Sequence, residues 1–132
     1  MMIASGAPKV LLVEENPLLP DITAFRLELL GFQVEKAVTG AEAVAVVQNQ
    51  LPDVIIIELI LPDTDGIDLT NRLKNDRRTS SIPIMILSHV AELDDVQLVH
   101  GAGADDYLVV PYDPIVLEQK LERLLAAVGK TL

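Results

Sequence analysis

Five short apolar segments recur along the chain, and three of them are nearly continuous rather than alternating with polar residues. The segments are Lys9–Val13, Phe32–Val38, Asp53–Ile57, Ile82–Leu87 and Asp105–Val110. Continuous apolar runs of this length are typical of strands that are covered on both faces, as they are in a parallel sheet. The pattern therefore predicts five mostly buried strands.

Apolar residues at helical spacing lie between the strand segments. The clearest stripes are Leu18, Ile22, Phe25 and Leu29; Ala41, Val44, Val47 and Leu51; and Leu117, Leu121, Leu124, Leu125 and Val128. Residues at this spacing share one face of a helix, so we expect all three stripes to face the core. Strands that alternate with helices predict an α/β fold with right-handed crossovers and a parallel sheet.

Local signals mark where several helices begin and end. Thr39 and Glu42 have the spacing of a capping box. The pair Asp113–Pro114 is typical of an N-cap followed by proline at the first helical position. Gly31 and Gly101 lie where helix C-caps are expected.

Composition narrows the class of protein. The 132 residues predict a single domain over residues 1–132, with its core at about residues 9–127. The absence of cysteine excludes disulfides and thiolate metal sites. Twenty Asp and Glu against ten Lys and Arg give a net charge of -10, which argues against direct nucleic-acid binding. No apolar run approaches the roughly 18 residues of a membrane span, so we expect a cytoplasmic domain without membrane contact.

Acidic residues directly follow two of the predicted strands. Glu14 and Glu15 come after the first strand, and Glu58 comes after the third. In an open parallel sheet, ligands bind beyond the carboxyl ends of the strands. Any one of these acids alone is most simply a solvated loop residue, but three carboxylates at one edge suit Mg²⁺, which prefers hard oxygen ligands. The sequence therefore predicts a candidate Mg²⁺ site at these three residues.

The chain resembles the receiver domains of two-component response regulators over residues 9–127, and four segments carry the resemblance. They are KVLLVEENPLL, PDVIIIELILPDTDGIDL, IPIMILS and GADDYLVVPYDP. The resemblance implies a flavodoxin-like fold, in which a doubly wound parallel sheet has the strand order 2-1-3-4-5. It also implies a role in signal transduction.

The resemblance assigns roles by position. Glu58 stands at the phosphoacceptor position, and the switch residues Ser88 and Tyr107 follow thirty and forty-nine residues later. Val110 stands at the lysine position, fifty-two residues after Glu58. In the family a main-chain carbonyl joins the acids in holding the metal, and that carbonyl is here the one of Ile60.

Three positions depart from the family pattern, because Glu58 and Glu15 replace aspartates and Val110 replaces a lysine. An acyl phosphate forms when the carboxylate meets the phosphorus in line while a metal and a cation spread the developing charge. The longer Glu58 costs about two orders of magnitude in rate, and the missing lysine costs about 3 kcal/mol of charge stabilisation. We therefore expect conventional phosphorylation to be lost and Mg²⁺ binding to be weak.

The sequence thus favours a non-enzymatic receiver-like domain that signals through protein–protein contact. Expected partners are a histidine kinase, an output or effector protein, or a second copy, bound through the fourth and fifth helices and the fifth strand. That face would include Leu93, Val96, Gln97, Tyr107 and Leu117. The alternative is a Mg²⁺-dependent receiver of a phosphorelay that uses Glu58 inefficiently. A flavodoxin-like cofactor binder is less well supported, because Glu14 and Glu15 would repel a phosphate after the first strand.

Two further residues bear on this pocket. Without the lysine, the acids must bind a cation, hold a carboxyl with a raised pKa or turn one Glu outward. His89 follows Ser88 and is the nearby candidate for a substitute cation; it either caps Glu58 or points to solvent. Pro20 falls about four residues into the first predicted helix, on the surface where the family docks its kinase, and we expect the helix to tolerate it.

Overall fold

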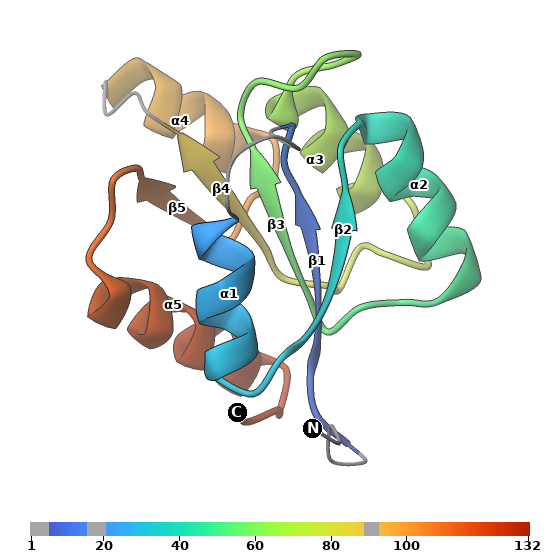
Figure 1. The fold of residues 1–132 in the computed structure, drawn as a ribbon. Coiled ribbons are helices and arrows are strands. Elements are labelled where there is room, and N and C mark those ends of the chain that lie inside the picture. Colours follow the sequence, from blue (N-terminus) through green and yellow to red (C-terminus); the bar gives the residue numbers. More distant parts are fainter. Residues whose placement is uncertain (1–5, 16–20, 89–92) are drawn as a thin grey trace.

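The computed structural model describes residues 6–15, 21–88 and 93–132, and in these ranges five strands alternate with five helices (Figure 1). The strands are β1 (Lys9–Val13), β2 (Gln33–Ala37), β3 (Val54–Glu58), β4 (Ile84–Ser88) and β5 (Asp106–Val109). The helices are α1 (Ile22–Leu29), α2 (Gly40–Asn49), α3 (Gly66–Lys74), α4 (Leu93–Gly101) and α5 (Pro114–Ala127). All neighbouring strands pair in parallel in the order β2-β1-β3-β4-β5, so the predicted fold class and strand order are confirmed.

Helices cover both faces of the sheet, which explains why the strand segments are almost continuously apolar. α1 and α5 lie on one face, and α2, α3 and α4 lie on the other (Figure 1). In β1, Val10 and Leu12 pack toward α1 and α5, whereas Leu11 and Val13 pack toward the other three helices. Successive side chains of a strand point to opposite faces, so a strand covered on both sides needs apolar residues at every position.

The predicted helix starts at α2 and α5 are confirmed. The Glu42 N–H donates to Thr39 Oγ1 at 3.0 Å, and the Glu42 carboxylate accepts a hydrogen bond from the Val38 N–H at 2.8 Å. At α5, the Ile115 N–H donates to Asp113 Oδ1 at 2.8 Å. These side chains satisfy backbone N–H groups that have no partner within the helix.

The two glycines predicted to end helices behave differently. Gly31 follows α1 and has a φ of 100°, a left-handed conformation that glycine adopts without a steric penalty. The prediction for Gly101 is wrong, because Gly101 is the last residue of α4 and the positive φ of 99° belongs to Gly103. The helix continues to Gly101 because the turn that leads into β5 is made two residues later.

The stripe predicted to bury α1 faces outward instead. Three of its residues are 62%, 60% and 71% exposed, namely Ile22, Phe25 and Leu29. The helix contacts the core through Ala24 and Leu27. It begins at Ile22, because Asp21 caps it by accepting a hydrogen bond from the Ala24 N–H at 2.9 Å. Pro20, which the sequence analysis placed about four residues into this helix, lies outside the described residues, as does Leu18.

The other two stripes agree with the prediction in part. In the α2 stripe Val47 is buried and Val44 is half-buried, but Ala41 is exposed, and the helix ends at Asn49 and leaves Leu51 exposed. The four leucines of the α5 stripe are buried, whereas Val128 lies beyond the helix end and is exposed. In the described ranges, no helix has both the length and the apolar character needed to cross a membrane.

Candidate functional site

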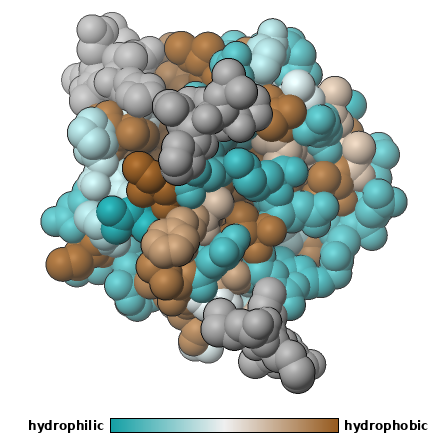
Figure 2. Space-filling view, in the orientation of Figure 1, coloured by the Kyte–Doolittle hydropathy of each residue, from teal (hydrophilic) through white to brown (hydrophobic). Residues whose placement is uncertain are grey.

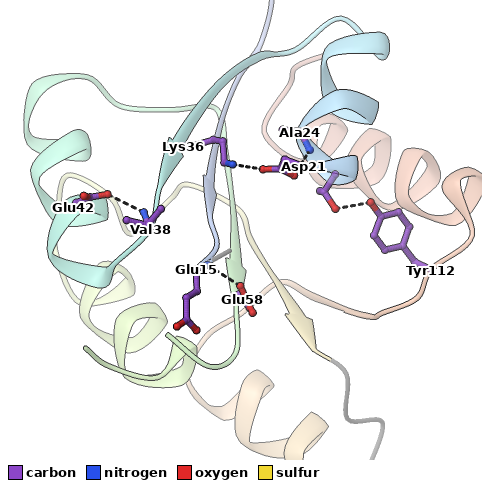
Figure 3. Close-up of polar contacts among 9 residues, drawn as sticks. Glu15, Asp21, Ala24, Lys36, Val38, Glu42, Glu58 and Tyr112 are labelled. Carbon is purple, nitrogen blue, oxygen red and sulfur yellow. Dashed lines mark hydrogen bonds and ion pairs between the residues drawn. The ribbon is translucent and has the colours of Figure 1, made fainter. Parts of the chain in front are cut away.

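Glu58 is the last residue of β3 and lies half-buried at the carboxyl edge of the sheet. Its Oε2 atom accepts a hydrogen bond from the backbone N–H of Glu15 at 3.0 Å (Figure 3). β1 and β3 are neighbours, with Val13 beside Ile57, so the residues after β1 leave the sheet next to the end of β3. The Glu58 carboxylate therefore fastens the start of the loop after β1 to the end of β3.

Glu14 pairs with Asp21, the N-cap of α1. The Lys36 ammonium of β2 lies 2.5 Å from the Asp21 carboxylate (Figure 3). A hydrogen bond between the two carboxyl groups contributes to the raised pKa of Glu14. Burial, the hydrogen bond with Asp21 and the Asp21 charge raise the pKa of Glu14 to about 8. Burial opposes the ionisation of Asp21, but hydrogen bonds from Glu14, the Ala24 N–H and Lys36 outweigh it and lower the pKa of Asp21. Glu14 therefore donates the shared proton at neutral pH.

The Glu14–Asp21 pair reduces the repulsion that we expected among the acids at this edge of the sheet. Of the three alternatives that the sequence left open, the raised carboxyl pKa is the one that fits Glu14. The cause differs from the expected one, because burial and Asp21 dominate and the charge of Glu58 contributes least. Glu14 thus avoids repulsion at the edge of the sheet by holding a proton for Asp21.

The three predicted metal ligands share one edge of the sheet, but their carboxylates do not converge. Glu14 is paired with Asp21, Glu58 accepts the hydrogen bond described above, and the exposed Glu15 side chain points away from Glu58 (Figure 3). Among residues 6–15, 21–88 and 93–132, no three Asp, Glu or His side chains form a group that could hold a metal ion. In this arrangement the carboxylates do not fit Mg²⁺, which needs oxygens at near-ideal octahedral distances.

The loop between β3 and α3 carries Ile60 and is held firmly at both ends. The Gly66 N–H donates to the Leu59 carbonyl at 2.6 Å, and the Asp63 carboxylate accepts two hydrogen bonds, at 2.9 and 3.1 Å, from the first N–H groups of α2. A Cβ at Gly66 would lie 2.6 Å from the Glu58 carbonyl oxygen, so glycine alone fits there. The loop is therefore fixed beside Glu58, and the metal-binding role of the Ile60 carbonyl stays a prediction.

The predicted switch residues and the lysine position lie on β4, β5 and the residue after β5. Ser88 and Tyr107 are both buried, and Tyr107 packs inward among the apolar side chains that face α2, α3 and α4. The Val110 N–H donates to the Ser88 carbonyl at 2.7 Å, and the Val110 side chain packs against the core beneath α1 and α5. A valine side chain brings no positive charge to Glu58.

The structure shows which residues named for the partner face are exposed. Leu117 is fully buried and Tyr107 is buried as well, so neither offers contact surface. Gln97 is exposed, and its neighbour Leu98 is 57% exposed. Outside the described part of the structure lie His89 and the side chains of Leu93 and Val96, so the contact between His89 and Glu58 stays a prediction.

Two polar contacts beside the site were not predicted from the sequence. One is the ion pair of Lys36, and the other joins the Tyr112 and Thr23 hydroxyls at 2.7 Å (Figure 3). Burial raises the pKa of Tyr112. Lys36 lies beside Leu12 in the pairing of β2 with β1. The charge of Lys36, one residue before the carboxyl end of β2, could have indicated an ion pair with an acid beyond the sheet.

The Glu14→Gln variant is expected to be more stable than the wild type at alkaline pH. The pKa of Glu14 is raised in the fold from 4.5 to about 8, so its contribution to stability is complete below the lower value and is lost as the pH rises through the upper one. A glutamine amide donates to Asp21 at every pH. After discounting for partial solvent screening, we expect a gain of about 2 kcal/mol near pH 9 and little change near pH 5.

Urea unfolding across this pH range measures the effect. The Glu28→Gln variant removes an exposed carboxylate from α1 and serves as the charge-matched control. Equal pH slopes for the two variants would contradict a shared proton between Glu14 and Asp21.

The fold and the acids at the ends of β1 and β3 together define a receiver-type domain. The family model of the response regulator receiver domain matches residues 10–122, and the chain belongs to this family. The expectation drawn from the sequence segments is thereby confirmed at the level of the family.

Curated relatives agree with this assignment. The chain is 34% identical to the DNA-binding dual master transcriptional regulator RpaA of Synechocystis, over 94% of this chain and 50% of that protein. It is also 34% identical to the phosphate regulon transcriptional regulatory protein PhoB of Pseudomonas aeruginosa, over 91% of this chain and 52% of that protein. The chain therefore spans about half the length of these relatives.

Solved structures of receiver domains match the fold closely. The receiver domain of a signal transduction histidine kinase from Syntrophus aciditrophicus has a TM-score of 0.86 and 32% identity, covering 96% of both chains. The receiver domain of a sensor histidine kinase from Pseudomonas aeruginosa has a TM-score of 0.83 and 29% identity, covering 92% of this chain and 99% of that one. The latter is described with a magnesium ion coordinated in its active-site cleft.

Proposed function

We propose that this receiver domain signals through protein–protein contact, without catalysis of its own and without conventional phosphorylation. The observation that carries the proposal is the state of Glu58, whose carboxylate already accepts a hydrogen bond from the Glu15 N–H. Val110 stands where the family places its lysine. The acceptor position is therefore longer than an aspartate, engaged in the fold, and without the lysine that would face the phosphoryl group.

The electrostatics of phosphoryl transfer support this view. Charge spreads over the phosphoryl oxygens in the transition state, and fixed cations are needed to stabilise it. Here the carboxylates beyond β1 and β3 do not converge on a metal-sized space, and position 110 is apolar. We therefore propose that Mg²⁺ binds this domain more weakly than it binds a typical receiver.

The exposed stripe of α1 is the surface that we propose for a protein partner. Ile22, Phe25 and Leu29 form a run of large apolar side chains along the outer side of the helix, and Figure 2 shows hydrophobic residues gathered over α1. Burying these side chains against a partner lowers the free energy, because each one removes substantial apolar surface from water. The partner would be a histidine kinase or an output or effector protein, and we propose that the contact takes place in the cytoplasm.

A second surface lies on α4, where the exposed Gln97 and Leu98 border a groove between α3 and α4. Ile115, at the start of α5, is exposed as well. This surface keeps part of the face expected from the sequence, although Leu117 and Tyr107 do not contribute to it. We propose it as the site of self-association or of an output partner.

The alternative function is a Mg²⁺-dependent receiver of a phosphorelay that uses Glu58 inefficiently. The observation that favours it is the related Pseudomonas aeruginosa receiver with magnesium in its cleft. In this reading the Glu58–Glu15 hydrogen bond opens to admit a metal, and Glu58 becomes a slow acceptor.

Incubation with acetyl phosphate and Mg²⁺, followed by intact mass measurement, distinguishes the two functions. We expect no mass gain for this domain under conditions in which a conventional receiver is modified. A stoichiometric, hydroxylamine-labile adduct on Glu58 would establish the alternative and contradict the proposed function.

A further inference from the structure

We propose that this domain associates head to tail with further copies of itself, with α1 of one copy lying in the groove between α3 and α4 of the next. The inference rests on the proposed function, because it joins the two exposed surfaces assigned to protein contact and names what occupies each of them. The two surfaces match in length, in apolar character and in charge.

The groove lies between α3 and α4, on one face of the sheet, and has a volume of about 660 Å³ (Figure 1). Ile67 of α3 and Leu98 of α4 line it, and Leu98 is 57% exposed. Asp68 and Asn71 add polar groups on the α3 side. The groove therefore suits an occupant that offers apolar side chains together with a group able to bind a carboxylate.

Gly101, the last residue of α4, lines the groove and is exposed. A Cβ at this position would meet no atom within 4 Å, and the φ of Gly101 is not positive. Neither packing nor backbone conformation within the chain therefore requires glycine, although glycine is less favourable than alanine in a helix. The bare backbone leaves room in the groove wall for a large side chain of an occupant to approach closely.

α1 presents a ridge that matches the groove. Ile22, Phe25 and Leu29 are exposed along its outer side, and Arg26 borders them. α1 has eight residues, whereas α3 and α4 have nine each. At the rise of an α-helix, a ridge about 12 Å long would lie along two helices of about 13.5 Å each. The apolar stripe of α1 can therefore follow the groove over its whole length.

The two surfaces also carry opposite charges. None of the ion pairs that the described residues form includes Arg26, beside the stripe, or Asp68, beside the groove. The chain has a net charge of -10, so copies repel one another at long range. A pair between Arg26 of one copy and Asp68 of the next supplies a local attraction and fixes how the two copies meet.

The fold makes this contact an open-ended one. α1 lies on one face of the sheet, and α3 and α4 lie on the other (Figure 1). Two copies cannot make both contacts with each other at once, so each pair keeps one free stripe and one free groove. The contact also covers α1, so a foreign partner that binds this helix must displace the neighbouring copy.

Sedimentation velocity of the 132-residue domain, from about 10 μM to 1 mM, tests the inference. Leu29→Glu places a charge in the stripe, and Gly101→Leu fills the groove at a position where a side chain has space. Leu51→Glu is the matched control, because it makes the same change at an exposed leucine that follows α2. Thermal unfolding shows that each variant is folded, and Leu98→Glu replaces Gly101→Leu if the latter is not.

We expect the wild type and Leu51→Glu to associate with a Kd of about 100 μM, because a contact of this size is small. Leu29→Glu and Gly101→Leu should each associate at least about tenfold more weakly. A mixture of these two variants should form a 1:1 dimer that grows no further, because each variant supplies the surface that the other lacks.

Four results would overturn the inference: a wild type that stays monomeric, association of either surface variant as strong as that of the wild type, a loss of association in Leu51→Glu, or a mixture that stays monomeric. Neither a phosphodonor nor a second protein is present, so such a failure leaves the proposed function standing. A phosphoryl adduct on Glu58 would conversely contradict the proposed function without affecting this contact.

Discussion

A domain carrying both Glu58→Asp and Val110→Lys is expected to accept a phosphoryl group from acetyl phosphate about 10⁴-fold faster than the wild type. The shorter side chain brings the carboxylate back by about one C–C bond, which is worth about two orders of magnitude in a positioned reaction. The lysine restores a fixed cation, worth about two more. The displaced carboxylate and the missing cation each slow the reaction independently, so neither single variant should reach the rate of the double variant.

The backbone at Val110 is held in place, so a lysine can be introduced there without changing the path of the chain. Its N–H is bonded to the Ser88 carbonyl, so the backbone at this position is held by the sheet, beyond the end of β5, whatever the side chain. Initial rates of adduct formation by mass measurement check the expectation. Glu58→Gln with Val110→Lys supplies the cation without an acceptor carboxylate and should remain unmodified. Recovery by Glu58→Asp alone would show that the missing lysine matters less than supposed.

Replacing Leu27 by alanine is expected to cost about 3 kcal/mol of the free energy of unfolding, whereas Leu29→Ala should cost less than about 0.5 kcal/mol. Leu27 is fully buried on the inner side of α1, but Leu29, two residues later in the same helix, is 71% exposed. The two substitutions remove the same atoms from the same helix. Their difference therefore reports burial and not helix propensity.

Urea unfolding of the two variants at neutral pH checks this expectation. Phe25→Ala is a second exposed-face variant and should behave like Leu29→Ala. Equal losses for Leu27→Ala and Leu29→Ala would mean that the outer side of α1 is covered, and the proposed partner surface would be lost with it.

The three central strands, β1, β3 and β4, could be predicted from the sequence because each buries both faces, whereas the edge strand β2 exposes Glu35 and Lys36. Val10 and Leu11 pack on opposite sides of β1, so the strand is apolar at every position from Val10 to Val13. The start of α5 was equally predictable, because the cap at Asp113 is a local interaction. Helix caps that depend on neighbouring residues, and strands that are buried on both faces, can therefore be predicted without knowledge of the fold.

The buried face of α1 could not be predicted by the same reasoning. Large apolar residues at helical spacing indicate one face of a helix, but they do not say whether that face meets the core or a partner. Here the smaller pair, Ala24 and Leu27, meets the sheet, and the larger stripe is exposed. The cap at Asp21 sets where the helix begins.

The candidate site was predictable in position but not in contacts. Strand order brings Glu14 and Glu58 to one edge of the sheet, which spacing and topology indicated. The partners of these acids depend on side-chain directions and on residues distant in sequence, as the pairing of Asp21 with Lys36 shows. The family's own pattern pointed to a lysine after β5 and gave no reason to look for one on β2.

The amide NMR spectrum of the wild-type domain with Mg²⁺ and beryllofluoride tests the loss of phosphorylation most directly. Beryllofluoride stands in for a phosphoryl group on a carboxylate, and it remains bound where an acyl phosphate would hydrolyse before a mass is recorded. We expect the resonances of Glu58, Ser88 and Tyr107 to stay unchanged as both reagents are added. Saturable shifts at these three residues, absent in Glu58→Gln, would show that the site still accepts a phosphoryl group and would contradict the account.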